Sequence, residues 1–218
     1  MSTETSPMTE PGVPRCHCSA GPSRHDARRV VLTGGPGAGK TAVLEVVRRR
    51  FCEHVVVLPE AATIVFGGGF PRRPSFEARR RAQLAIFHVQ DQMEQLELAE
   101  RDAALVLCDR GVVDGLAYWP GEPDAYWREV RTTPAEVMAR YEAVIHLRTP
   151  DAQNGYDHSN PIRIESAEEA MRIDARIAEV WASHPRCYVV ESRADFVEKL
   201  ERTLKIIAAL TPACCARR

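Results

Sequence analysis

Gly34-Gly35-Pro36-Gly37-Ala38-Gly39-Lys40-Thr41 is the stretch that decides the fold. It follows an apolar run at residues 30–33 and leads into an amphipathic helical pattern. The stretch satisfies G-x-x-x-x-G-K-[ST] in the strand–loop–helix context that this phosphate-binding loop requires. Its glycines let successive N–H groups turn toward phosphate oxygens, and the next helix presents its positive N-terminal end. A glycine-rich turn that binds nothing is the alternative, but such a turn rarely matches the whole pattern.

The loop predicts a site for a nucleoside triphosphate. Lys40 supplies a mobile positive charge for the outer phosphates, and the Thr41 hydroxyl can bind Mg²⁺. The residues expected to contact the nucleotide are Gly34, Gly35, Pro36, Gly37, Ala38, Gly39, Lys40, Thr41 and Ala42. The sequence contains no Asn/Thr-Lys-x-Asp element of the kind that usually recognises guanine. We therefore expect ATP with Mg²⁺ rather than GTP.

Composition narrows the class of protein. The chain has 218 residues, 44% of them hydrophobic, which suits one α/β domain with short tails. Its formal net charge of −1 and its scattered basic residues argue against a nucleic-acid partner. The sequence has neither an apolar run long enough to span a membrane nor an apolar signal-peptide core, so we expect a cytoplasmic protein.

The seven cysteines show no spacing typical of a disulfide framework. Cys16-His17-Cys18 and Cys214-Cys215 could bind a metal, but both lie in expected tails and neither has a second ligand pair at the usual spacing. We therefore interpret the cysteines as reduced thiols.

Five apolar runs alternate with helical patterns, at residues 30–33, 54–58, 104–108, 144–147 and 187–190. This alternation predicts an α/β, three-layer P-loop NTPase with a five-stranded parallel sheet and helices on both faces. We expect a disordered arm over residues 1–28, the domain over 29–210 and a tail over 211–218.

Several helices have recognisable start signals. Ser75 is a plausible N-cap for a long helix that reaches about Arg101, and capping boxes occur at residues 133–136 and 166–169. Asp195 is expected to cap the last helix. The glycine- and proline-rich residues 67–74 are either a flap over the substrate or only a long connection. On the long helix, Arg79, Arg80 and Gln83 face either solvent or the acceptor.

Polar residues follow the apolar runs. Thr33, Glu60, Asp109 and Thr149 all stand where a parallel strand should end, which is where ligands bind in such sheets. Asp109 is the expected second ligand of the Mg²⁺ ion, or else a structural carboxylate that caps the next turn. Arg110 would point into the cleft and neutralise phosphate charge, or else form a surface ion pair.

Glu60 is the candidate general base. Placed at the end of the strand neighbouring the phosphate loop, it could take a proton from the attacking hydroxyl or position a Mg²⁺-bound water. The alternative is that Glu60 only caps the following helix. Arg163, Arg172 and Arg176 lie in and after the irregular segment that follows the fourth strand, where they could stabilise the transferring phosphoryl group. A solvated helix face is the alternative for these arginines.

Three motifs together carry a resemblance to a known family: GGPGAGKT at residues 34–41, PEAA at 59–62 and CDRGVVDGLAYW at 108–119. With a late arginine-bearing helix, they resemble the AAA-type ATP-binding domains related to the kinase half of the nicotinamide riboside kinase regulator, and the TRPL-translocation-defect protein family. More distantly, the chain is similar to deoxynucleoside and thymidylate kinases. The resemblance covers residues 29–210 and implies a nucleotide-kinase-like fold with the phosphate-loop strand at its centre.

The resemblance also implies roles for matching residues. Lys40 and Thr41 match the triphosphate and Mg²⁺ ligands, Glu60 the acidic residue after the second strand, and Asp109-Arg110 the pair after the third. Arg163 and Arg172 fall in the lid region.

Two functions from different classes follow from these residues. The first is a small-molecule kinase that transfers the γ-phosphate of ATP to the hydroxyl of a nucleoside- or metabolite-like acceptor. The second is a nucleotide-dependent binding or switch protein, for ATP or GTP, that signals through residues 67–74 or the N-terminal arm. A ring-forming motor ATPase is less favoured because the chain lacks the extra helical domain of such motors.

Overall fold

A computed structural model describes residues 25–100, 102–150, 167–192 and 195–216. The predicted N-terminal arm lies almost wholly outside these residues, as do Arg163 and most of the segment after the fourth strand.

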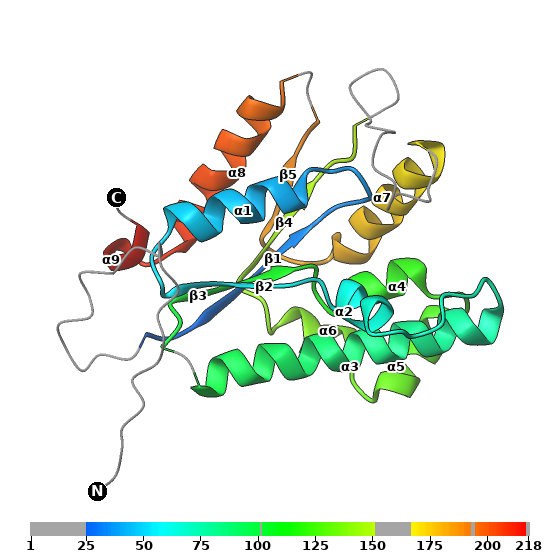
Figure 1. The fold of residues 1–218 in the computed structure, drawn as a ribbon. Coiled ribbons are helices and arrows are strands. Elements are labelled where there is room, and N and C mark those ends of the chain that lie inside the picture. The colour runs from blue at the N-terminus through cyan, green and yellow to red at the C-terminus, as the bar shows by residue number, and fades with distance from the viewer. Residues whose placement is uncertain (1–24, 101, 151–166, 193–194, 217–218) are drawn as a thin grey trace, which may run out of the picture.

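Five parallel strands form the central sheet (Figure 1). They are β1 (Arg28–Thr33), β2 (Val55–Leu58), β3 (Leu105–Asp109), β4 (Ala143–Leu147) and β5 (Cys187–Val190). Their order is β2-β3-β1-β4-β5, and Val31 of β1 pairs with Cys108 on one side and Val144 on the other. The predicted five-stranded parallel sheet is confirmed, with the phosphate-loop strand at its centre. One detail is corrected: the strand before Glu60 is β2, which is separated from β1 by β3.

Helices cover both faces of this sheet, as predicted (Figure 1). The helices are α1 (Lys40–Arg50), α2 (Ala61–Gly67), α3 (Phe76–Glu100), α4 (Asp114–Tyr118), α5 (Pro123–Val130), α6 (Pro134–Met138), α7 (Ala167–Trp181), α8 (Phe196–Leu210) and α9 (Ala213–Ala216). One hydrophobic cluster joins the sheet to α1, α8 and α9, and a second joins it to α3 through α7. Because both faces are covered, the inner strands are continuous apolar runs rather than alternating ones.

The helix start signals that can be compared are confirmed. Thr133 and Glu136 form the expected reciprocal capping box, and Asp195 accepts a hydrogen bond from the Val197 N–H at 2.7 Å. Ser75 Oγ accepts from the Ala78 N–H at 3.3 Å, one residue before α3. Only the capping box at residues 166–169 begins outside the described residues.

The expected C-terminal tail differs from the structure. Residues 213–216 form α9, and Cys215 is only 3% exposed in the cluster beneath α1 and α8. Packing of its side chain stabilises a helix that is too short to form alone.

α3 is the longest helix described and is rich in charged residues. None of the described helices is both long and apolar enough to span a membrane.

Candidate functional site

A cavity of about 1080 Å³ opens at the carboxyl ends of the strands. The phosphate loop and the start of α1 form one wall, and α2, residues 71–74 and α3 form the other. Glu60 and Asp109 line it as expected, whereas Thr33 and Thr149 do not and instead support its wall from behind. The Thr149 hydroxyl, for example, donates to the carbonyl of Pro36 at 3.2 Å.

The phosphate loop needs glycine for steric reasons. Gly34 and Gly39 have φ angles of 140° and 92°. A Cβ at Gly34 would lie 2.1 Å from the Leu147 carbonyl oxygen, and one at Gly39 would lie 2.6 Å from the Phe196 ring. The loop can therefore follow this path between β4 and the start of α8 only without side chains at these two positions.

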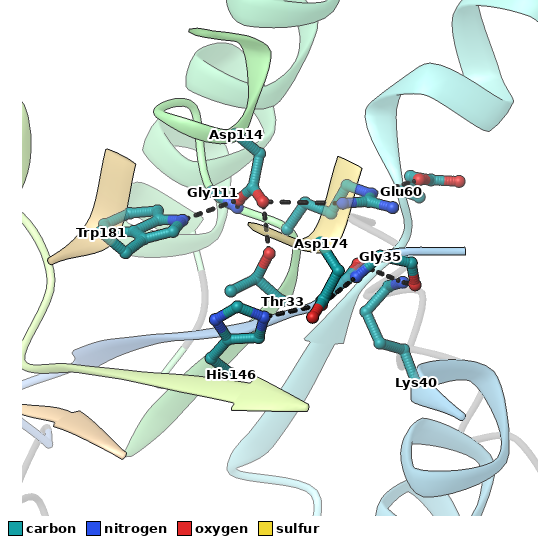
Figure 2. A network of polar contacts seen from close by, with 11 residues as sticks. Thr33, Gly35, Lys40, Glu60, Gly111, Asp114, His146, Asp174 and Trp181 are labelled. Atoms are coloured by element: carbon teal, nitrogen blue, oxygen red, sulfur yellow. Dashed lines mark hydrogen bonds and ion pairs between the residues drawn. The ribbon is translucent and has the colours of Figure 1, made fainter. Parts of the chain in front are cut away.

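Lys40 is the first residue of α1, and its side chain turns back over the loop. Its Nζ donates to the carbonyl oxygens of Gly34 and Gly35, at 3.0 and 3.4 Å (Figure 2). Burial and the nearby Arg110 guanidinium lower the pKa of Lys40 to about 8, although the neighbouring carboxylates oppose them. A bound triphosphate would favour the charged form and raise this pKa again.

Glu60 is held by two partners at the edge of the cavity. Arg110 Nε donates to Glu60 Oε1 at 2.7 Å, and the Thr63 hydroxyl donates to Oε2 at 2.7 Å. Burial would raise the pKa of Glu60, but Arg110, Thr63 and Lys40 outweigh it and lower the pKa to about 2. Glu60 occupies the N-cap position of α2, but its side chain makes no capping hydrogen bond. Because such a carboxylate is a weak base, these contacts favour Glu60 as the group that orients Arg110.

The low pKa of Glu60 predicts a pH-dependent contribution to stability. A carboxylate whose pKa is lower in the folded than in the unfolded protein stabilises the folded state at pH values above the unfolded pKa. This stabilisation is lost as the pH falls toward the folded pKa. The stability difference between wild type and Glu60→Gln should therefore shrink by about 2 kcal/mol between about pH 6 and about pH 3. Urea unfolding of both proteins at each pH measures it, and a difference that is constant with pH contradicts the assignment.

Arg110 lies between two carboxylates inside the cavity rather than on the open surface. Besides Glu60, it pairs with Asp114, whose Oδ1 is 3.6 Å from Arg110 Nη1, and its guanidinium lies 5.6 Å from the centre of the Tyr118 ring. Its backbone has a φ of 70°, which is uncommon for a residue with a side chain and marks a position of defined geometry. The ion pair is therefore part of the cavity wall.

Asp109 ends β3 with one carboxylate oxygen unsatisfied. Within the described part of the chain, its buried Oδ1 has no hydrogen-bond partner. Burial raises the pKa of Asp109, Lys40 opposes this, and Glu60 adds to it. A buried carboxylate oxygen beside the phosphate loop, with the Thr41 hydroxyl on the same cavity wall, is a donor set that fits Mg²⁺.

The sequence does not single out Asp114, yet this residue joins the core to Arg110. Figure 2 shows its carboxylate among Thr33, Gly111 and Trp181. It is only 2% exposed and accepts hydrogen bonds from the Thr33 hydroxyl, from the Gly111 N–H at 2.8 Å and from Trp181 Nε1 at 3.3 Å. Its carboxylate thus links β1, α4 and α7 and holds the guanidinium end of the Arg110 side chain.

A second buried carboxylate holds the phosphate loop from behind. Asp174 of α7 accepts from the Gly35 N–H at 2.9 Å, and it contacts His146 Nε2 at 2.8 Å and Arg148 Nη1 at 2.9 Å. Burial would raise the pKa of Asp174, but the bonds from His146 and Gly35 outweigh it and lower the pKa. A Cβ at Gly35 would lie 2.8 Å from Asp174 Cβ, so α7 packs directly against the loop.

Two of the arginines expected in a lid, Arg172 and Arg176, do not line the cavity. Arg172 is exposed on α7, 3.8 Å from Glu168, and Arg176 donates to the Trp119 carbonyl at 3.4 Å. Arg163 lies outside the described residues. The basic side chains opposite the phosphate loop are instead Arg72, Arg73 and Arg79.

The wall opposite the phosphate loop bears on two alternatives that the sequence leaves open. Gln83 of α3 lines the cavity and is 9% exposed, whereas Arg80 pairs with Glu77 and Glu129 at 3.4 and 3.3 Å outside it. Residues 71–74 also line the cavity, which favours a flap over a mere connection.

Comparisons with known proteins agree with this fold. A family model described as the AAA domain matches residues 29–199. Among solved structures, the fold is similar to thymidylate kinase from Candida albicans, with a TM-score of 0.57 and 11% sequence identity over 84% of this chain and 91% of that chain. At such low identity the similarity shows the P-loop kinase-like fold alone. No curated protein sequence matches the chain.

Proposed function

The chain belongs to the AAA domain family, and from this premise we propose that it is a kinase that transfers the γ-phosphate of ATP to a hydroxyl group of a nucleoside- or metabolite-like acceptor. The observation that carries the proposal is a cavity that the phosphate loop shares with a second wall, which bears Arg72, Arg73, Arg79 and Gln83. A nucleotide held by the loop alone would leave the wall formed by residues 71–74 and α3 without a role. That wall offers room and hydrogen-bonding groups for a second substrate.

The proposed reaction is an in-line transfer. The acceptor oxygen bonds to the γ-phosphorus, and the bond between that phosphorus and the β–γ bridging oxygen breaks, so that ADP leaves. The acceptor hydroxyl gives its proton to solvent. Lys40 and Arg110 reach the same cavity and would stabilise the negative charge on the transferring group. Thr41 and Asp109 would hold Mg²⁺, which supplies further charge neutralisation when bound. Glu60 and Asp114 keep Arg110 in position.

The acceptor wall indicates which compounds to test. Arg72, Arg73, Arg79 and Gln83 can donate hydrogen bonds to phosphate, carbonyl or ring nitrogen groups. Purified protein should therefore be incubated with ATP, Mg²⁺ and a panel of nucleosides, nucleoside monophosphates and other hydroxylated metabolites. A phosphorylated product that requires Lys40 supports the proposal. No product from any compound, with ATP hydrolysis no faster than in Lys40→Ala, contradicts it.

The switch function remains the second candidate because residues 71–74 line the cavity and follow the glycines at 67–69. In that case nucleotide alone should change protease cleavage within residues 67–74, and no product should form. Identical digestion patterns with and without ATP or GTP contradict this candidate.

A further inference from the structure

Three metal-binding side chains meet at the end of the sheet opposite the cavity. His25 lies shortly before β1, His54 immediately before β2, and Cys215 in α9. Because the strands are parallel, the starts of β1 and β2 lie at one end of the sheet, and the phosphate loop, which follows β1, lies at the other end. This cluster is therefore separate from the proposed active site.

The spacing of the ligand atoms suits one ion. Cys215 Sγ lies 3.6 Å from His25 Nε2 and 3.6 Å from His54 Nδ1. Tetrahedral Zn²⁺ with bonds of about 2.3 Å to sulfur and about 2.0–2.1 Å to nitrogen would place these ligands about 3.5 Å apart. All three ligand atoms lie within 4.8 Å of one another, so the imidazole rings would have to turn toward a shared ion to close the site.

The backbone fixes each of the three residues. The His25 N–H donates to Asp102 at 2.7 Å, and the His54 carbonyl accepts from the Ala104 and Leu105 N–H groups at 2.8 and 3.1 Å. Cys215 is anchored by burial in the core and by a hydrogen bond from its N–H to the Pro212 carbonyl at 2.8 Å. The ligands are thus brought together by the fold itself, which limits the ordering that a bound ion would have to impose.

We propose that His25, His54 and Cys215 bind a borderline-soft divalent ion, with Zn²⁺ as the preferred one. A thiolate and two imidazole nitrogens select such ions over Mg²⁺ or Ca²⁺, which prefer oxygen ligands. Both histidines are partly exposed, so solvent can reach the fourth coordination position. Binding deprotonates the Cys215 thiol and releases its proton to solvent. The ion would tie the N-terminal segment and α9 to the start of β2.

The test is titration of the metal-free full-length protein with Co²⁺ as a spectroscopic probe, followed by competition with Zn²⁺. One equivalent should produce the thiolate-to-cobalt charge-transfer band of a tetrahedral site, and Zn²⁺ should abolish it. Cys215→Ser should remove the band, and His54→Asn should weaken binding by at least about tenfold. Zn²⁺ should also raise the Tm of the wild type but not that of Cys215→Ser.

Matched variants separate this site from other thiols. Cys187→Ser, at a partly buried cysteine of β5, should leave the band and the affinity unchanged. The Cys16→Ser, Cys18→Ser double variant should retain binding with a charge-transfer band. Unaltered ATP binding by Cys215→Ser shows that this variant folds. Absence of the band in wild type, or its loss in the double variant but not in Cys215→Ser, overturns the proposal.

Discussion

Replacement of Lys40 by alanine should lower kcat/KM for phosphoryl transfer from ATP by about 10²- to 10³-fold, the scale of losing one preorganised donor to developing charge. The ammonium group is the part of the loop that can follow the outer phosphates, because its side chain lies over the loop carbonyls of Gly34 and Gly35. Steady-state kinetics with the best acceptor from the panel measures the effect. Lys205→Ala, which removes an exposed lysine of α8, is the matched control and should be silent.

The same variant should remain folded. A lysine whose pKa falls to about 8 in the folded protein carries its charge at a cost in free energy at neutral pH. That cost is fully present below about pH 8 and disappears as the pH rises toward the unfolded value of about 10.5. Lys40→Ala should therefore be no less stable than wild type at neutral pH. Loss of several kcal/mol in urea unfolding would show that Lys40 supports the core, and would contradict the role assigned to it.

Replacement of Asp114 by alanine should destabilise the protein by about 3–5 kcal/mol, as expected when one partner of a buried, charged network is removed. The Thr33 hydroxyl, the Gly111 N–H and Trp181 Nε1 would all lose their acceptor. Arg110 would also lose one of its two carboxylate partners. Urea unfolding monitored by circular dichroism measures the change, with Asp124→Ala, at an exposed position of α5, as the control.

Asp114→Asn tests the assignment more finely. The amide keeps the shape and one acceptor oxygen but removes the charge, so its effect should fall between those of wild type and Asp114→Ala. Its kcat/KM should fall more than its stability explains, because Arg110 is positioned through Asp114. If Asp114→Ala unfolds with the same midpoint as wild type, the carboxylate is not the buried junction described above.

The sheet could be predicted because its evidence is local in the sequence. Each strand is a short apolar run, and the spacing of the runs leaves room only for parallel strands joined by helices. The phosphate loop at residues 34–41 could be predicted for the same reason, since its glycines, Lys40 and Thr41 form a continuous pattern. That Asp109 lines the cavity could be predicted from its position at the end of such a run, whereas its role as a Mg²⁺ ligand stays a prediction. The position of β2 at the edge of the sheet could not, because strand order depends on long-range pairing.

Two buried carboxylates could have been suspected but not assigned. His146 interrupts an apolar strand and Asp174 shares a helix face with Ala170, Ile177 and Trp181, which signals a buried polar pair. The contact between Asp174 and the Gly35 N–H depends on how α7 packs against the phosphate loop, and no local sequence pattern predicts that packing. Asp114 lies in the same motif as Asp109 and Arg110, and nothing in the spacing of that motif shows that its side chain is buried.

Which arginines line the wall opposite the phosphate loop could not be decided from the sequence. The position of Arg172 after the fourth strand favours a lid residue, but its side chain lies on the solvated helix face that is the alternative, where it pairs with Glu168. The cavity is lined by Arg72, Arg73 and Arg79 because residues 71–74 and α3 form its far wall. Spacing along one helix can show that two side chains share a face, but not whether that face meets a cavity or solvent. Whether Arg163 contacts phosphate stays a prediction.

The attachment of Gly35 to α7 has a consequence for the thermodynamics of nucleotide binding. Its N–H is bonded to Asp174, and the space beside its Cα is filled by Thr149, Asp174 and the backbone of Ala170. The backbone of the first turn of the loop is therefore ordered during folding, so nucleotide binding does not carry the entropy cost of ordering it. Association should then approach the rate set by diffusion and electrostatic attraction, without a slow ordering step in this part of the loop.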